Sequence, residues 1–116
     1  MGADYEAMAA SGEALLVWQE HELVGVLVTH LEEHTLLIEN IAVSPDVQGS
    51  GLGSRLLGEA ERIAREAGRE VVRLYTNEAM VENLAFYSHH GFGETYRKVE
   101  EGFRRVYFSK RMSRQA

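Results

Sequence analysis

Runs of apolar residues divide the N-terminal third of the chain into three strand-like segments. ALLVWQE (14–20) and LVGVLVTHL (23–31) are rich in β-branched and aromatic residues, and HTLLIENIAV (34–43) continues the pattern. Short polar breaks at 21–22 and 32–33 separate the runs, and such breaks between strand-like segments are typical of tight turns. The pattern predicts three consecutive strands in an antiparallel meander.

The pattern then changes to helical spacing. Apolar residues between Leu52 and Ala67 recur every three or four positions, which predicts a helix with one apolar face. Gly68 suits the position just past the end of such a helix. EVVRLYT (70–76) again resembles a strand. A strand, a helix and a strand in succession predict a right-handed crossover in which 34–43 and 70–76 are parallel.

The remaining segments predict one more long helix and a hairpin. Asn77 is a residue type that favours the N-cap of a helix, and Gly91 is typical of the position after a helix C-terminus. The chain between them therefore predicts a helix of about 13 residues. ETYRKV and FRRVYFSKRM, joined through residues 100–102, predict a terminal hairpin. Residues 4–10 predict a short helix.

The order of these elements predicts an α/β (α+β) fold. It is a mixed, mostly antiparallel sheet with a β-α-β crossover and helices packed on it. With 116 residues and 45% hydrophobic content, the chain is expected to form a single domain over 1–116. Pro45, which cannot continue a central strand, follows the third predicted strand.

Composition excludes several functions. Without cysteine there is no disulfide, thiolate nucleophile or cysteine-bound metal. A net charge of -6 argues against a nucleic-acid partner and agrees weakly with a cationic small substrate. The N-terminus resembles no signal peptide and no segment is apolar enough to span a membrane, so we expect a cytoplasmic protein without a membrane partner. A zinc site from His30, Glu32 and His34 is conceivable, but we expect no metal site.

The candidate chemistry begins in VQGSGLGSR, where Gly49, Gly51 and Gly53 lead into the predicted helix. Glycines allow close backbone approach, and a helix N-terminus offers unpaired N-H groups, so the segment predicts a cradle for a phosphate or pyrophosphate. A Walker loop would need lysine after the last glycine, where Ser54 and Arg55 stand. The dinucleotide motif G-x-G-x-x-G would need glycine at position 54.

The pattern Q-x-x-G-x-G, formed by Gln48, Gly51 and Gly53 after a meander, resembles the coenzyme-A loop of the GNAT superfamily of acyl-CoA N-acyltransferases. NEAMVENLAFYSHHGF (77–92) resembles the family's later motif, in which an Asn, a helix bearing a Tyr and Gly-Phe follow one another. The two motifs occur in the family's order. The resemblance covers roughly residues 14–110 and implies a GNAT-like fold with acetyl-CoA as cosubstrate.

The resemblance also implies an N-acetyltransferase in which an amine attacks the thioester of acetyl-CoA directly in a ternary complex. In the family, the pantetheine arm lies along the strand before the loop, here Ile41, Ala42 and Val43, and the Val43 amide is a candidate oxyanion donor. Tyr87, by its motif position, is the candidate proton donor to the leaving thiolate. The implied pyrophosphate contacts are Gln48, Gly49, Ser50, Gly51, Leu52, Gly53 and Ser54.

Other roles remain open at this stage. Glu39, two residues before Ile41, is a candidate base that acts directly or through water, or else a solvent-facing strand residue. Strand alternation places Asn40 on the opposite face. Asn83 is expected to contact the cofactor or cap local backbone. Arg55 either contacts a phosphate or is simply exposed.

The acceptor is the least determined part. Family members normally begin with a strand and one or two helices that line the acceptor pocket, whereas here only residues 1–13 precede 14–20. We expect a small-molecule or peptide amine as partner, and strand 14–20 as an unpaired sheet edge that invites a homodimer. The alternative is a degenerate relative that binds CoA or a protein without catalysis. A third hypothesis, a nucleotide-phosphate binder unrelated to CoA, requires both motifs to be accidental.

Overall fold

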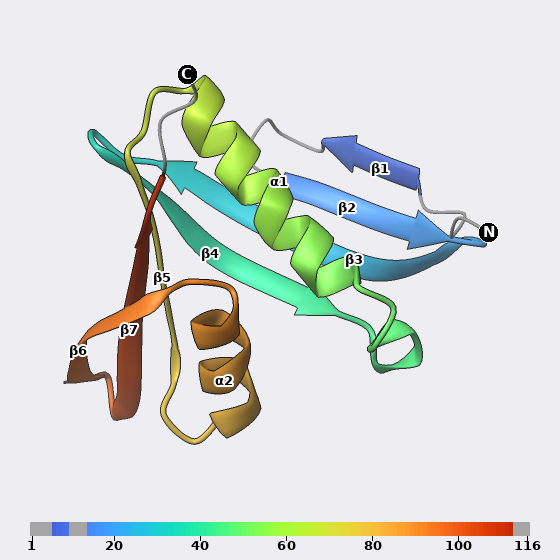
Figure 1. Ribbon diagram of the computed structural model, residues 1–116. Helices are drawn as coiled ribbons and strands as arrows, with labels where there is room; N and C mark the ends of the chain where they lie inside the picture. Colours follow the sequence, from blue (N-terminus) through green and yellow to red (C-terminus); the bar gives the residue numbers. More distant parts are fainter. Residues whose placement is uncertain (1–5, 10–13, 113–116) are drawn as a thin grey trace.

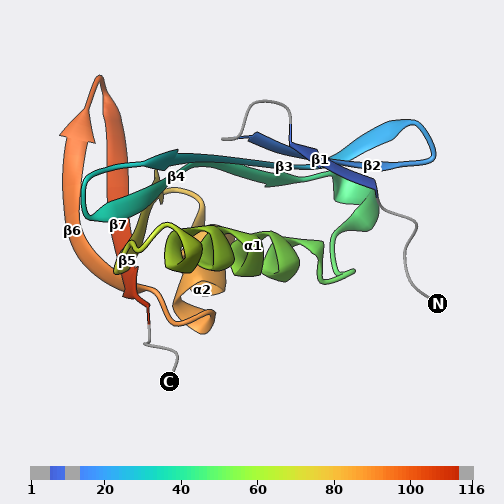
Figure 2. The same ribbon diagram turned by 90° about the horizontal axis from the view of Figure 1, so that it is seen from above.

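In the described part of the chain, seven strands form one sheet, and two α-helices lie on one of its faces (Figures 1 and 2). The computed structural model describes residues 6–9 and 14–112. In chain order the elements are β1 (Glu6–Ala9), β2 (Ala14–Gln19), β3 (Glu22–Leu31), β4 (Thr35–Val43), the 3-10 helix η1 (Pro45–Val47), α1 (Leu52–Glu66), β5 (Val71–Asn77), α2 (Val81–His89), β6 (Gly93–Glu100) and β7 (Phe103–Arg111).

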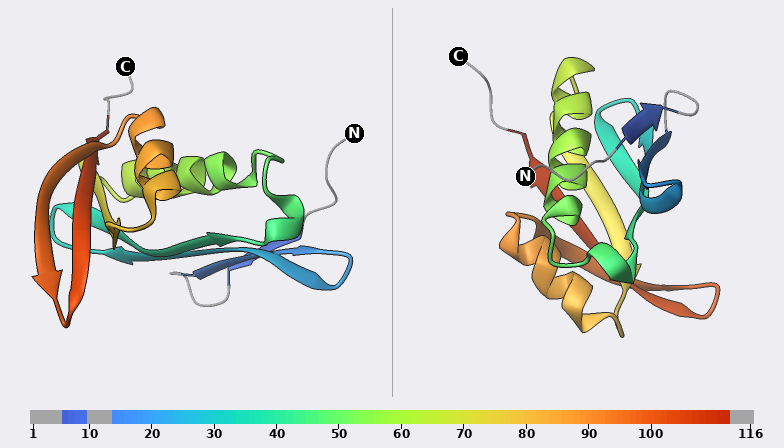
Figure 3. Two further views of the ribbon diagram at one scale, coloured as in Figure 1. Left: turned by 90° about the horizontal axis from the view of Figure 1, so that it is seen from below. Right: turned by 90° about the vertical axis from the view of Figure 1, so that its right-hand side faces the viewer.

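The strand order is β1-β2-β3-β4-β5-β7-β6. Among the described strands, only β4 and β5 pair in parallel, and α1 connects them; the other neighbouring pairs are antiparallel. This confirms the predicted mixed sheet with one crossover. Figure 3 shows α1 and α2 on the same side of the sheet. The opposite side, which neither helix covers, is called the uncovered face below.

The predicted meander is confirmed, with its first turn displaced by one residue. Glu20 and His21 both adopt left-handed backbone conformations, with φ of 49° and 71°. Two such residues form the kind of tight turn whose twist matches that of a β-hairpin. The turn therefore occupies 20–21, and β3 begins at Glu22.

The predictions for the N-terminal segment are wrong. Residues 6–9 of the expected helix 4–10 form β1, which pairs antiparallel with β2, while residues 4, 5 and 10 lie outside the described residues. A helix this short cannot offset its nucleation, whereas β2 offers a row of backbone partners. Since β1 pairs with it, β2 is not an unpaired edge, and the reason for expecting a homodimer there no longer applies.

Helix α1 is confirmed where its spacing predicts it. Its apolar face is buried against β3, β4 and β5 and forms much of the core. Gly68, with φ of 73°, follows the last turn in a conformation that favours glycine. The buried residues of the helix are Leu52, Leu56, Leu57, Ala60 and Ala64.

Helix α2 is shorter than predicted and has a different cap. Asn77 ends β5 instead, and its side-chain oxygen accepts a hydrogen bond of 2.8 Å from the Ala79 N-H. Such an Asx turn competes with capping, because the same oxygen cannot also serve a helix that starts later. The helix begins after Met80 and has nine residues. Gly91, with φ of 88°, follows its end as expected.

The terminal hairpin is confirmed, and its strands are placed out of sequence order. Glu101 and Gly102, with φ of 50° and 82°, form the turn between β6 and β7. The last strand, β7, lies between β5 and β6. This arrangement sets Tyr75 of β5 opposite Tyr107 of β7.

Candidate active site

The sheet opens between its two parallel strands. The β4–β5 ladder joins 35–38 to 71–74 and ends at the pair Ile38 and Leu74. Beyond it β4 remains paired with β3, and β5 with β7, so the two strands diverge (Figure 1). The end of β4 therefore presents a strand edge to the opening instead of to β5.

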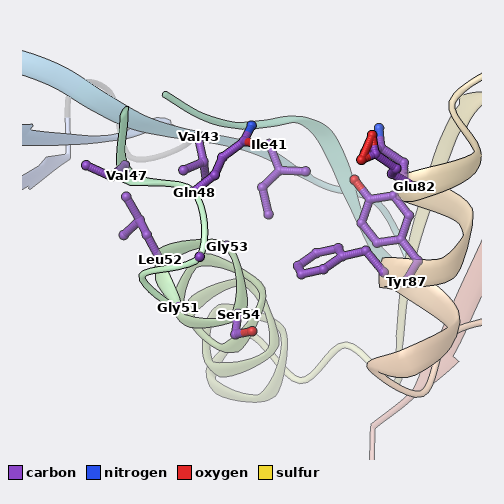
Figure 4. A pocket seen from close by; sticks show the side chains of 13 residues that line it. Ile41, Val43, Val47, Gln48, Gly51, Leu52, Gly53, Ser54, Glu82 and Tyr87 are labelled. Atoms are coloured by element: carbon purple, nitrogen blue, oxygen red, sulfur yellow. The ribbon is translucent and has the colours of Figure 1, made fainter. Parts of the chain in front are cut away.

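A cavity of about 490 Å³ occupies this opening. Figure 4 shows Ile41 and Tyr87 on opposite sides of it, with Gly51 and Gly53 at the start of α1. The cavity lies between the end of β4, the loop before α1 and one side of α2. Its lining residues are Ile41, Val43, Val47, Gln48, Gly49, Gly51, Leu52, Gly53, Ser54, Glu82, Asn83, Phe86 and Tyr87.

The glycine loop has the backbone form of an anion cradle. Gly49 and Gly51 have φ of 86° and 89°, and a Cβ on either would meet no atom within 4 Å. Conformation rather than crowding therefore requires glycine here. The first helical hydrogen bond runs from the Arg55 N-H to the Gly51 carbonyl, at 3.1 Å. The N-H groups of Gly53 and Ser54 precede that bond and are available to an anion.

Gly53 is required for a different reason. A Cβ at this position would lie 3.2 Å from Cζ of Phe86 and 3.9 Å from a methyl carbon of Val43. The absence of a side chain lets α1 and α2 approach each other closely. Because α1 and α2 lie close together, the glycine loop and the Tyr-bearing helix α2 line the same cavity.

A side-chain contact also joins the loop to α2. Oγ of Ser54 and Nε2 of His90 lie 3.1 Å apart, and the His90 ring packs edge-on against Phe86 with centroids 4.5 Å apart. Sequence reasoning did not identify His90 as a site residue. The available signal is the i, i+4 row of Glu82, Phe86 and His90, which runs beside the row of Asn83 and Tyr87.

Tyr87 is fixed by aromatic packing. It is 5% exposed, and its ring contacts those of Phe86, Phe92 and Phe108 at centroid distances of 5.5, 6.0 and 5.8 Å. Figure 4 shows its hydroxyl on the side of β4. Burial raises the pKa of Tyr87 above its ordinary 10.0, so the phenol stays protonated at neutral pH. It can therefore donate a proton or a hydrogen bond into the cavity.

Asn83, one turn before Tyr87, points its amide toward β5. Nδ2 donates to Oγ1 of Thr76 at 3.3 Å and contacts Sδ of Met80 at 3.6 Å. This leaves its side-chain oxygen as an acceptor. Asn83 lines the cavity, so cofactor contact and local bonding, the two roles expected for it, are compatible.

A second, smaller cavity of about 240 Å³ lies beside the first. The two share Ile41, Asn83 and Tyr87, so Tyr87 stands between them. Its other lining residues come mainly from the diverging ends of β4 and β5. These are Ile38, Glu39, Asn40, Leu74, Tyr75, Thr76 and Met80.

Glu39 lies where β4 departs from regular pairing. Thr29 pairs with Ile38 and Val28 with Asn40, so Glu39 is an extra residue in β4. This bulge interrupts the alternation from which opposite faces were expected, and both Glu39 and Asn40 are exposed and line the smaller cavity. The bulge thus brings a carboxylate to the side of Tyr87 away from the glycine loop.

Three other residues from the sequence predictions lie outside these linings. Ala42 is exposed and pairs with Val26, and Arg55 is exposed on the first turn of α1. Oγ of Ser50 accepts a hydrogen bond of 3.4 Å from the Leu52 N-H. Their expected cofactor contacts stay predictions.

Metal ligands and membrane-spanning helices can be assessed for the described residues. Within 6–9 and 14–112, no cluster of three or more His, Cys, Asp or Glu is placed to hold a metal ion. Glu32, from the zinc alternative, is bonded to Arg73 at 2.8 and 2.7 Å. No described helix is long and apolar enough to cross a membrane.

Comparison with known proteins identifies the family. The family description "Acetyltransferase (GNAT) family" matches residues 2–92, and the chain belongs to this family. The aminoalkylphosphonate N-acetyltransferase of Salmonella typhimurium is 31% identical over 87 residues, which are 70% of this chain and 56% of that protein. The chain thus spans about half of that relative's length.

Solved structures agree on the fold. The nourseothricin acetyltransferase structure superposes with a TM-score of 0.81 at 23% identity, covering 86% of this chain and 65% of that one. A GNAT family acetyltransferase from Elizabethkingia anophelis, solved with acetyl-CoA bound, has a TM-score of 0.73 at 21% identity and covers 84% and 74%. The predicted GNAT-like fold is therefore confirmed.

Proposed function

We propose that this protein is an N-acetyltransferase that moves the acetyl group of acetyl-CoA to a primary amine in a ternary complex. The observation that carries the proposal is the position of Tyr87 between two contiguous cavities. One contains the glycine cradle, and the other contains Glu39. Donor and acceptor can therefore meet at Tyr87 from opposite sides.

Acetyl-CoA suits the larger cavity on physical grounds. Its pyrophosphate requires the N-H groups and the positive end of α1, which the loop from Gln48 to Ser54 supplies. Its pantetheine arm carries amides that can pair with an open strand edge, and the end of β4 from Ile41 to Val43 is such an edge. The crystal structure of the Elizabethkingia relative, which holds acetyl-CoA, supports this choice of donor.

The reaction needs few groups. The amine nitrogen attacks the thioester carbon, the carbonyl oxygen becomes an oxyanion, and the carbon-sulfur bond breaks to give an amide and CoA. We assign stabilisation of the oxyanion to the Val43 N-H, because Val43 lines the larger cavity. Tyr87 donates its proton to the departing sulfur, whose reference pKa of roughly 8.5 lies below that of the phenol. Glu39 accepts the proton that the amine loses, directly or through water.

Relatives support an amine acceptor of small size. The Salmonella relative is named for aminoalkylphosphonates, which carry a primary amine. The acceptor-side cavity of about 240 Å³ is also below the usual range of roughly 300–1,000 Å³ for sites of drug-sized ligands. A small-molecule amine therefore agrees better with the site than a long peptide, which would have to enter by its N-terminus alone.

Calorimetric titration with acetyl-CoA tests the donor site. Gly51→Asp places a side chain and a negative charge in the cradle at a positive φ, so binding should be lost. Gly51→Asn has a similar shape and conformational preference without the charge, and should bind better than Gly51→Asp. Gly58→Asp is the matched control, because Gly58 is exposed on the same helix with open space around it.

Binding must then be followed by turnover. Release of CoA thiol in the presence of amines would support the enzyme. Acetyl-CoA binding without turnover on any amine would instead support the alternative of a CoA-binding or interaction module. Tighter binding of ATP than of acetyl-CoA would overturn both and leave a nucleotide-phosphate binder. The melting temperature of each variant shows whether binding is lost at the site or because the protein no longer folds.

A further inference from the structure

The smaller cavity adjoins a row of tyrosines on the uncovered face. Its lining residue Tyr75 is 38% exposed, whereas its neighbours Leu74 and Thr76 are buried on the helix side, so Tyr75 points to the uncovered face. The ring of Tyr75 lies 5.3 Å from that of Tyr107, which stacks on Tyr96 with centroids 4.3 Å apart. The row therefore runs from the cavity to β6.

One cation lies directly over the cavity end of this row. The guanidinium carbon of Arg105 is 4.5 Å from the centroid of the Tyr75 ring. The ladder places Arg105 opposite Asn77, on the same face as Tyr107. A planar guanidinium stacked on an aromatic ring is oriented by it. The Arg105 guanidinium already interacts with Tyr107 and Glu100, but its five N-H donors outnumber these two partners.

Arg105 is less closely paired with a carboxylate than Arg73 of the neighbouring strand β5. Arg73 is held by both carboxylate oxygens of Glu32, at 2.8 and 2.7 Å. Arg105 contacts Glu100 at 3.5 Å, and this carboxylate also accepts the Tyr107 hydroxyl and lies 3.7 Å from Nζ of Lys98. Two cations therefore share one anion, which leaves the group with a surplus positive charge beside the cavity.

We propose that Arg105, seated on Tyr75, binds an anionic group of the acceptor. The acceptor is then a small amine that also carries a carboxylate, phosphonate or phosphate. Its amine lies toward Glu39 and its anionic group toward Arg105, since Glu39 and Tyr75 directly follow the last residues of the β4–β5 ladder. The inference rests on the proposed function, because it assigns the substrate class of the same site.

The charges next to the proposed site, rather than the net charge of the chain, determine whether the acceptor is anionic. A charge of -6 favours cationic ligands at long range. At physiological salt, however, exposed charges are screened beyond about 8 Å, so a bound ligand responds mainly to the groups that contact it. At this position those groups are Arg105, Lys98 and Glu100. The planar guanidinium can bind a carboxylate or phosphonate through two parallel hydrogen bonds.

The test compares amines that differ in the anionic group. With acetyl-CoA, kcat/KM is measured for 2-aminoethylphosphonate, β-alanine and propylamine. The proposal expects at least one anionic amine to exceed propylamine by about tenfold or more, the effect of a charge-assisted hydrogen bond. The two anionic amines distinguish phosphonate from carboxylate. If propylamine is acetylated as efficiently as both, the anion site is wrong and the proposed function stands.

Substitutions in β7 test whether Arg105 is the side chain responsible for the preference for anionic amines. Arg105→Gln should reduce the ratio of anionic to neutral kcat/KM, mainly through KM, and Arg105→Lys should restore part of it. Arg104→Gln is the matched control, because Arg104 is the adjacent residue, with a side chain 75% exposed. An unchanged ratio in Arg105→Gln overturns the assignment. Acetyl-CoA affinity and melting temperature verify the fold.

Failure of the proposed function has a different signature. A wild-type protein that releases no CoA with any amine overturns the acetyltransferase proposal, and the acceptor assignment with it. Selectivity without an anionic preference overturns the acceptor assignment alone. The wild-type comparison also decides the substrate class if Arg105→Gln does not fold.

Discussion

The two cavities that share Tyr87 differ in how far backbone and side chains supply their polar groups. The larger owes its expected polar contacts to backbone: the strand edge with Ile41 and Val43, two left-handed glycines and the first N-H groups of α1. The smaller is made mostly by side chains from the diverging ends of β4 and β5, with Glu39 and Tyr75 among them. A backbone site suits a ligand common to a family, while a side-chain site can change its ligand by substitution.

The residue between the cavities should show the largest effect. Tyr87→Phe keeps the ring and its three aromatic contacts but removes the hydroxyl that we propose as the proton donor. We expect kcat to fall about 100-fold, within the range of general acid catalysis, while acetyl-CoA binds as before. Rapid-mixing kinetics of thiol release together with calorimetry would measure both.

The control for this substitution is Tyr96→Phe, on a tyrosine that is 51% exposed and lines neither cavity. A Tyr87→Phe enzyme that retains kcat within about threefold of wild type would remove the phenol from the proton transfer. The raised pKa of Tyr87 adds a second test. The phenol should remain protonated to a higher pH than a free tyrosine, so activity should not decline near pH 10 through this group.

The side-chain cavity should respond to Glu39→Gln. The change keeps the shape of the side chain and removes its ability to accept a proton. We expect kcat/KM to fall about tenfold or more, and the acidic limb of its pH profile to move, as for loss of a general base. Glu33→Gln is the control, because that side chain is 88% exposed in the β3–β4 turn. An unchanged rate and profile would leave Glu39 as a solvent-facing residue.

The backbone cavity should respond more weakly to loss of a side chain. His90→Ala removes the contact with Oγ of Ser54, and one hydrogen bond corresponds to roughly two- to tenfold in affinity. The expected result is a correspondingly higher Kd for acetyl-CoA with little change in kcat. His89→Ala, at the exposed neighbouring position, should leave Kd as it is. Equal effects of both would indicate loss of helix stability instead.

The same division explains what the sequence could predict. Gly51 and Tyr87 could be predicted because each belongs to a contiguous sequence motif, the glycine loop and the Tyr-bearing segment 77–92. The contact of Arg105 with Tyr75 joins residues of different strands and depends on β7 inserting beside β5, which no local pattern specifies. The bulge at Glu39 likewise depends on the register with β3.

Two errors at the level of elements have the same origin. The segment 6–9 is too short for its periodicity to distinguish helix from strand, so the open edge of β2 decides its structure. Asn77 has the right residue type for a helix cap, but the chain needs several more residues to turn from β5 before α2 begins. In both cases tertiary geometry overrides a local preference.

The smallest expected effect lies at the closed end of the strand pair. The hydrogen-bonded Arg73 lowers the pKa of Glu32 from its usual 4.5 to about 2. A lowered carboxyl pKa contributes stability above pH 4.5 that is lost as the pH falls toward 2. Both side chains are about one-third exposed, at 29% and 35%, so screening limits the contribution to about 1 kcal/mol.

Glu32→Gln should therefore lower the free energy of unfolding by about 1 kcal/mol at pH 7, and the difference from wild type should vanish near pH 2. Urea denaturation at both pH values measures this. Because the ion pair lies where β4 and β5 are still joined, acetyl-CoA affinity should not change. A loss of affinity would mean that the closed end of the ladder controls how far the strands diverge around Tyr87.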